Sequence, residues 1–190
     1  NNDRPGIMLS SSIKKYIDYF GVKCGDKISL FTNNDSAYET AVSLSKSGTT
    51  VNSIIDIREK SESIIVNQAK DLGIKIYWKH SIVNTQGYKK INSIDIMKLS
   101  DDGTSVTGNK IKEKCDCLGI SGGWTPMVHL FTQSGGKLKF NEIDNIFIPD
   151  KGSPDQISIG SCNGDFELDD VLKNSNNLTK NFIASESSEF

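Results

Sequence analysis

Two strand–helix alternations in close succession constrain the fold of this chain more than any other feature. Apolar, strand-like runs lie at residues 27–31, 51–57 and 74–78, and segments with helical spacing separate them at about 36–47 and 65–72. Short strands that alternate with helices are typical of βαβ units, in which the strands run parallel and the helices cover the sheet. We therefore expect an α/β fold with a parallel, Rossmann-like βαβαβ sheet.

The flanking segments extend this pattern in both directions. Apolar residues recur at i, i+3, i+4 and i+7 over residues 13–20, which predicts a helix before the first strand. After the third strand, strand-like runs at 81–85, 91–99 and 105–112 are separated by turn residues. This spacing predicts an antiparallel β-meander inserted into the domain. The chain then returns to the parallel sheet at 115–121.

These patterns divide the chain into four parts. We expect a lead-in helix and linker at 1–26, a Rossmann-like domain at 27–123, a return segment at 124–175 and a frayed tail at 176–190. The chain starts without methionine and has polar ends, so we expect it to be a piece of a longer polypeptide.

The return segment is predicted to contain a strand followed by a helix. Residues 156–160 read as a strand that ends in glycine, and residues 165–174 carry apolar side chains at helical spacing. The stretch past Asn174 is mostly polar, which is why the tail is expected to be frayed.

Composition excludes several classes of function. The 22 basic and 24 acidic residues give a net charge of −2, and no window shows the basic face of a nucleic-acid-binding protein. No apolar run approaches the roughly 20 residues that span a bilayer. We therefore expect no nucleic-acid partner and no membrane association, and we expect a cytoplasmic location.

The four cysteines are too few and too scattered for a disulfide framework or a metal site. We expect Cys115 and Cys117 to be core thiols that face opposite sides of the sheet. No nucleophile and base stand at a spacing typical of catalysis, so we identify no catalytic residue.

The turn after the first strand departs from the dinucleotide-binding pattern. That pattern needs G-x-G-x-x-G, and the matching positions here are Thr32, Asn34 and Ala37. Asp56 stands at the end of the second strand, where an acid would bind a ribose. Asp35 places a negative charge at the helix N-terminus, where a phosphate would have to bind. Two interpretations of this turn remain: it no longer binds a nucleotide, or it still binds one. The sequence favours the first interpretation.

Ser36 and Glu39 have the spacing S-x-x-E of a capping box. The sequence therefore predicts that this helix caps its first turn with its own side chains.

Two glycine-containing turns supply the candidate cofactor-binding residues. These residues are Gly122 and Gly123, after a buried strand, and Gly160, Ser161, Asn163 and Gly164, between a strand and a helix. Glycine permits close backbone approach to a ligand, and amides before a helix can hold an anion or a ribityl chain. The alternatives are a tight turn with Trp124 plugging the core, and an ordinary capped turn.

Three strings of residues, in order along the chain, carry a resemblance to a known family. They cover residues 31–38 (Phe-Thr-Asn-Asn-Asp-Ser-Ala-Tyr), 121–130 (Ser-Gly-Gly-Trp-Thr-Pro-Met-Val-His-Leu) and 133–138 (Gln-Ser-Gly-Gly-Lys-Leu). Together they resemble the α subunit of heterotetrameric sarcosine oxidase, and residues 4–9 and the pair Asn163-Gly164 fit that family too.

The resemblance implies a fold similar to the pyridine nucleotide–disulfide oxidoreductases, in which two dinucleotide-type domains are interleaved. The chain would hold most of the second, inserted domain and the return to the first. Residues 160–164 match the place where such proteins return to the cofactor of the first domain. Ser161 stands where related flavoproteins carry an acid.

The resemblance also implies cofactors, partners and an activity. NAD would bind the α subunit largely through an upstream domain, and flavins and tetrahydrofolate would act in the full complex. The partners would be a flavin-bearing β subunit and the other subunits of a hetero-oligomer. The complex would demethylate sarcosine to glycine, pass the methyl carbon to tetrahydrofolate and pass electrons to oxygen, while the isolated chain would be inactive. The alternatives are a subunit of another amine or opine oxidoreductase, and a non-catalytic lobe that docks a flavin-bearing partner.

Overall fold

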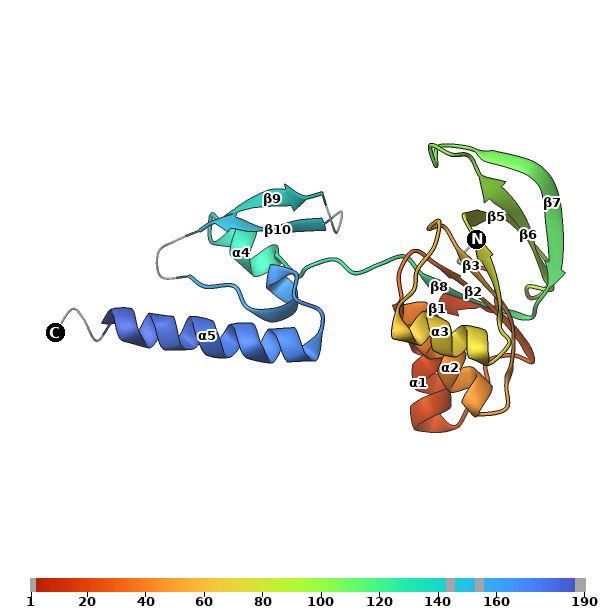
Figure 1. The fold of residues 1–190 in the computed structure, drawn as a ribbon, viewed down its shortest axis with the longest axis horizontal. Coiled ribbons are helices and arrows are strands. Elements are labelled where there is room, and N and C mark those ends of the chain that lie inside the picture. Colours follow the sequence, from red (N-terminus) through yellow and green to blue (C-terminus); the bar gives the residue numbers. More distant parts are fainter. Residues whose placement is uncertain (1–2, 143–145, 153–155, 187–190) are drawn as a thin grey trace. The chain divides into compact units, whose positions relative to one another are not determined.

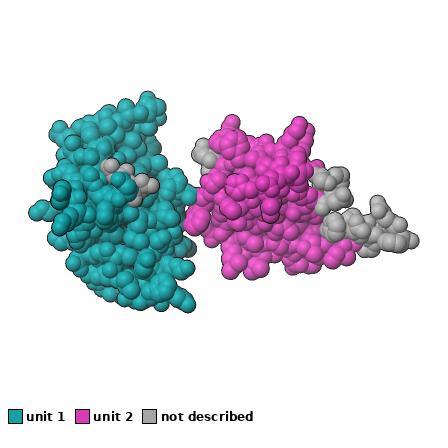
Figure 2. Space-filling model, turned by 180° about the vertical axis from the view of Figure 1, so that it is seen from behind, with its two compact units in different colours: residues 1–123 teal, residues 124–190 magenta. Residues whose placement is uncertain are grey.

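A computed structural model describes residues 3–142, 146–152 and 156–186 of the chain. Its residues form two compact units, unit 1 up to Gly123 and unit 2 from Trp124 onward. Figure 2 shows the two units in different colours, and each is described here by itself.

A parallel sheet forms the centre of unit 1. Within the described residues it has five strands in the order β1 (Ile7–Leu9), β8 (Cys117–Ser121), β2 (Lys27–Thr32), β3 (Thr50–Asp56) and β4 (Lys75–Trp78). Three helices connect the strands: α1 (Ser10–Phe20), α2 (Ser36–Lys46) and α3 (Ile64–Asp71). All neighbouring strands are parallel, so the predicted Rossmann-like sheet is confirmed.

The helices and the meander cover opposite faces of this sheet (Figure 1). On one face, Ile13, Tyr38 and Val66 from the three helices pack with sheet residues in one apolar core. On the other face packs the antiparallel sheet of β5 (His80–Gln86), β6 (Ser93–Leu99) and β7 (Val106–Lys114). Its residues Ile94 and Ile96 join a second core. The predicted meander insertion is therefore confirmed.

Cys115 and Cys117 belong to these two different cores. Burial raises the pKa of the Cys115 thiol to about 11 and that of the Cys117 thiol to about 12. Both thiols are protonated at neutral pH, so they act as small apolar side chains, as the sequence predicts.

Strand β1 was not predicted. Its three residues pair with β8 from Ile7↔Leu118 to Leu9↔Ile120, so the segment expected to be only a helix and a linker also supplies an edge strand. Three residues are too few for a strand periodicity to be visible. The strand exists because β8, distant in sequence, offers it a hydrogen-bonding edge.

Unit 2 is smaller and is built around a hairpin. It contains α4 (His129–Gln133), β9 (Lys137–Asn141), β10 (Ile146–Lys151), the 3₁₀ helix η1 (Gly160–Asn163) and α5 (Leu168–Glu186). Phe131 of α4 is buried against Gly136 and Gly152, where an added Cβ would lie 2.4 and 2.8 Å from its ring. These glycines leave the space that the phenyl ring fills.

Two predictions for unit 2 are wrong. The described residues 156–159 form no strand, because no neighbouring strand among the described residues pairs with them. Helix α5 does not end at Asn174 but continues to Glu186, with hydroxyls of Ser175 and Thr179 bonded to the carbonyls four residues earlier. The tail expected to be frayed is thus helical up to that point, and residues 187–190 lie outside the described residues.

None of the helices in the described part of the chain combines the length and apolar character that a membrane crossing needs.

Candidate functional site

The carboxyl ends of β2 and β8 mark the place where a nucleotide would bind in this fold. Strand β3, which follows β2 in the chain, lies on one side of β2 within the sheet. Strand β8 lies on the other side of β2. In open α/β sheets, ligands bind in the crevice at such a change of strand order. Thr32 and Ser121 are register partners, so the turns that follow them face one another.

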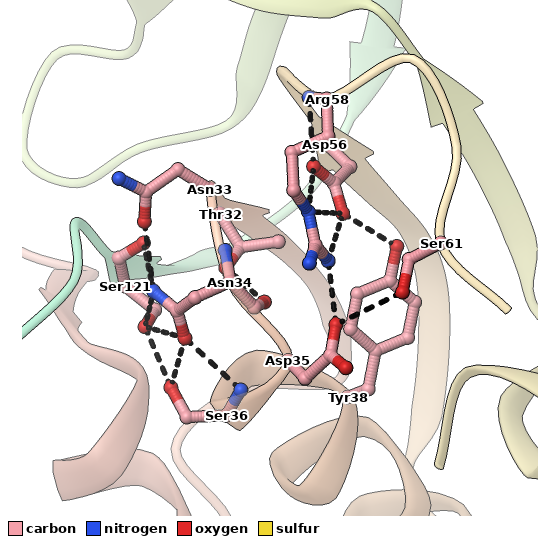
Figure 3. Close-up of polar contacts among 10 residues, drawn as sticks. All are labelled: Thr32, Asn33, Asn34, Asp35, Ser36, Tyr38, Asp56, Arg58, Ser61 and Ser121. Atoms are coloured by element: carbon pink, nitrogen blue, oxygen red, sulfur yellow. Dashed lines mark hydrogen bonds and ion pairs between the residues drawn. The ribbon is translucent and has the colours of Figure 1, made fainter. Parts of the chain in front are cut away.

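Direct hydrogen bonds between the two turns occupy this crevice (Figure 3). Asn33 Nδ2 donates to the Gly122 carbonyl at 3.1 Å, and Asn34 Nδ2 lies 3.2 Å from Ser121 Oγ. Ser36 Oγ is 2.8 Å from the same Ser121 hydroxyl. The side chains that replace glycine in this turn therefore bind the neighbouring strand end.

The capping box is not formed, and the prediction that Ser36 and Glu39 cap each other is wrong. Helix α2 starts at Ser36, whose hydroxyl donates to Asn34 Oδ1 at 2.6 Å, and Glu39 is exposed. Asn34 Oδ1 also accepts the Ser36 backbone N–H at 3.0 Å. An asparagine readily binds the amide two residues onward, so Asn34 takes the role that the sequence assigned to Ser36.

Asp56 is buried and fully engaged by its own chain. Its side chain is 0% exposed, and it accepts hydrogen bonds from Tyr38 Oη at 2.8 Å and from Arg58 Nη2 at 2.8 Å. The Arg58 backbone N–H adds a third bond at 3.0 Å. Asp56 is therefore a structural acid at the strand end rather than a free ligand for a ribose.

Arg58 also pairs with Asp35, in front of helix α2. Arg58 Nη2 lies 2.7 Å from Asp35 Oδ1. Burial acts to raise the pKa of Asp35, but the hydrogen bond and charge of Arg58 help to outweigh it, so this pKa is lowered. Burial likewise acts against the charged form of Arg58, but its bonds to Asp56 and Asp35 raise its pKa. Asp35 is a carboxylate at neutral pH, and its charge opposes a phosphate at the start of α2.

These residues do not fit a dinucleotide in the turn of unit 1. Asn34 fills the approach that glycine would leave open, Asp35 repels a pyrophosphate, and Asp56 has no free access to a ribose. Sequence alone did not indicate the contributions of Arg58, Tyr38 and Ser121. One sequence signal was available. Arg58 stands two residues after Asp56, so its side chain can fold back and bind the Asp56 carboxylate.

Gly122 and Gly123 lie beside this network. Gly123 has a φ of +100°, a conformation that favours glycine, and an added Cβ there would lie 3.5 Å from the Asn33 amide. The proposed core plug is wrong, because Trp124 is 54% exposed and packs its ring 6.1 Å from that of Phe166.

Gly160, Ser161, Asn163 and Gly164 come together in η1 and the residue that follows it. Gly160 and Gly164 have φ of +73° and +93°, so both need glycine for backbone reasons. The two groups of candidate residues belong to different units. The turn from Gly160 to Gly164 makes no network comparable to that of unit 1 within the described residues, and it stays a candidate for cofactor binding.

An open pocket of about 190 Å³ lies elsewhere in unit 1, where Ile7, Phe31 and Ile120 of the parallel sheet meet residues 82–85 of β5. Its lining contains no ionisable side chain. Ligand sites usually combine an apolar wall with a few convergent polar groups, so we do not assign a function to this pocket.

No family model matches the sequence. Solved structures of two reductases have a similar fold over part of their chains. Thioredoxin reductase of T. acidophilum is 20% identical with a TM-score of 0.56, over 84% of this chain and 54% of that one. The flavoprotein disulfide reductase RclA of Escherichia coli is 14% identical with a TM-score of 0.59, over 90% of this chain and 37% of that one.

Sequence comparison defines the relationship more closely. The sarcosine oxidase subunit alpha of Corynebacterium sp. (strain P-1) is 32% identical over 174 residues, which cover 90% of this chain. The same subunit of Corynebacterium sp. (strain U-96) is 32% identical over 164 residues, or 86% of this chain. The chain is a relative of the sarcosine oxidase alpha subunits, and the predicted resemblance is confirmed. It spans 18% and 17% of the length of these two relatives.

Proposed function

We propose that this chain is part of the alpha subunit of an oxidase that demethylates sarcosine to glycine. The observation that carries this proposal is the 32% identity over 174 residues with a sarcosine oxidase alpha subunit. In the complex, tetrahydrofolate would accept the methyl carbon and oxygen would accept the electrons. Another amine or opine oxidoreductase and a purely scaffolding lobe are less favoured, because relatives from two genera carry the same name.

Within such a complex, we assign unit 1 a structural role. Its nucleotide turn is filled by its own side chains, so NAD would bind through segments outside this unit. The turn from Gly160 to Gly164 supports NAD binding by offering a backbone that can approach a ligand closely. Bound flavin would supply the oxidising power in the partner subunit, and this chain would hold cofactor and partner in place.

Exposed apolar side chains of unit 2 support a role in assembly. Seven of those in the described residues are more than half exposed: Trp124, Met127, Leu130, Phe147, Leu168, Leu172 and Ile183. Large exposed apolar surfaces of this kind are typical of proteins that contact another protein segment. We propose that the flavin-bearing subunit, or another part of the complex, covers them in the cytoplasm.

The 190-residue chain alone is expected to oxidise no sarcosine, because the part of it that the structure describes brings no residues together for catalysis and shows no flavin site. Oxygen uptake with sarcosine, measured on the purified chain with added flavin, should equal the flavin-only control. The assembled complex that contains this sequence should consume oxygen and release glycine. Turnover by the chain alone, or a complex inert toward sarcosine, would contradict the proposed function.

A further inference from the structure

Three lysines of β7 share the outward face of the meander. Lys110, Lys112 and Lys114 stand at alternate positions of the strand, and alternate side chains of a strand point to the same face. Glu113 stands between two of them and bonds to Ser29 of the parallel sheet at 3.0 Å, so its side chain points inward. The three lysines therefore point away from the parallel sheet, and all of them are exposed.

The turn between β5 and β6 adds two more lysines and a tyrosine to this face. Lys112 Nζ donates to the Gln86 side-chain oxygen at 2.6 Å, where β5 ends and the turn begins. In the turn, Tyr88 is 97% exposed, and Lys89 and Lys90 after it are exposed as well. We call the following six residues the basic face: Tyr88, Lys89, Lys90, Lys110, Lys112 and Lys114.

Carboxylates near the basic face offset only part of its charge. Asp95 is 1% exposed, lies 3.5 Å from Lys110 Nζ and accepts a hydrogen bond from the Gln86 amide at 3.1 Å. Asp116 accepts the backbone N–H groups of Asp26 and Lys27 at 3.0 and 2.8 Å. The basic face therefore keeps an excess of positive charge, although the whole chain has a net charge of −2.

This combination of charge and exposure selects the kind of partner. Complementary charge steers protein association, and exposed tyrosine is a frequent anchor of protein interfaces. A nucleic acid carries negative charge along its whole length, so a chain with net negative charge would repel it beyond the basic face. An acidic surface of a folded polypeptide can match the basic face alone.

We propose that the basic face of the meander binds an acidic surface of a partner subunit. The lysines steer the two surfaces together, and Tyr88 packs against the partner once they meet. This inference rests on the proposed function, in which the chain is part of one subunit of a complex.

Charge reversal of the basic face in the intact protein tests the inference. The variant carries Lys89→Glu, Lys90→Glu and Lys112→Glu, and its association with the purified partner subunits is followed by stopped-flow fluorescence. At about 50 mM salt, association should be at least about tenfold slower than in the wild type. Raising the salt to about 300 mM should slow the wild type but not the variant.

Tyr88→Ala separates anchoring from steering. It leaves every lysine in place, so the association rate should stay within about twofold of the wild type. Dissociation should become about fivefold faster or more, as expected when an interface anchor is truncated. An unchanged dissociation rate would remove Tyr88 from the interface and overturn that part of the inference.

A triple variant with Lys15→Glu, Lys23→Glu and Lys60→Glu is the matched control, because it makes the same change in net charge at exposed lysines outside the basic face. Its association rate should stay within about twofold of the wild type, and urea unfolding should show all variants as stable as the wild type. Equal slowing by both triple variants would show an effect of net charge alone and overturn the inference.

Three other results have distinct meanings. Unchanged association in the variant with the reversed basic face would overturn the inference. A mixed-sequence DNA duplex that binds the wild type but not this variant, with subunit association unchanged, would replace the acidic subunit by a nucleic acid and overturn it too. A complex that assembles through the basic face but leaves sarcosine unoxidised would overturn only the proposed activity.

Discussion

Replacing Arg58 by alanine is expected to destabilise unit 1 by about 3–5 kcal/mol, the cost of leaving a buried charge without its partner. Asp56 is completely buried, and Arg58 supplies its only ion pair among the described residues. Without the guanidinium, the carboxylate would retain Tyr38 Oη and the backbone N–H of residue 58 as donors. Urea unfolding of the variant and the wild type at neutral pH gives this difference in free energy.

Two further variants show whether the buried charge is the cause. Asp35→Asn breaks only the pair of Arg58 with a carboxylate whose side chain is 37% exposed, so it should cost no more than about 1 kcal/mol. Asp56→Asn combined with Arg58→Ala removes both charges and should be less destabilised than Arg58→Ala alone. Equal losses in the single and double variants would show that packing, and not charge, explains the effect.

Replacing Glu113 by alanine is expected to cost about 2–4 kcal/mol, because it leaves two fully buried hydroxyls without their acceptor. Glu113 of β7 accepts hydrogen bonds from Ser29 at 3.0 Å and from Ser53, and both serines are 0% exposed. Its other oxygen accepts from Tyr77 Oη at 3.3 Å. One side chain of the meander thus binds three strands of the parallel sheet.

Glu113→Gln is the control for this prediction, since the amide oxygen can still accept from the serines. We expect it to cost about 1 kcal/mol, the value of a typical hydrogen bond. Thermal or urea unfolding measures both variants. If the free energy of unfolding of Glu113→Ala were lower than that of the wild type by less than about 0.5 kcal/mol, the contact between β7 and the parallel sheet would not contribute to stability.

The parallel sheet was predictable because its signal is local. Each of the strands β2, β3 and β4 is an apolar run bounded by polar or glycine residues, and α2 and α3 show helical spacing between them. These features need no knowledge of distant contacts.

The errors lie where distant or competing contacts decide the structure. Strand β1 depends on β8, more than a hundred residues away in sequence. At the start of α2, Ser36 and Asn34 are alternative capping residues. Asn34 forms the capping bond, and its side chain also contacts Ser121 across the crevice. Helix α5 extends through a stretch rich in asparagine, which has a low helix propensity.

For the candidate site, the sequence could predict only that the turn of unit 1 does not bind a dinucleotide. The loss of all three glycines and the charge of Asp35 indicated that the turn of unit 1 does not suit a dinucleotide. The residues that fill it, Arg58, Tyr38 and Ser121, come from different elements and have no motif that links them.

Calorimetric titration of NAD against Asn34→Gly and Asp35→Ala variants of the intact protein tests most directly whether unit 1 has lost its nucleotide site. Both variants should bind NAD within about twofold of the wild type, a difference of roughly 0.4 kcal/mol. Asn34→Gly restores a glycine of the binding pattern, and Asp35→Ala removes the repelling charge, so both would strengthen binding if the nucleotide sat in this turn. A change in affinity of about tenfold or more in either variant would place the nucleotide in unit 1 and contradict its structural role.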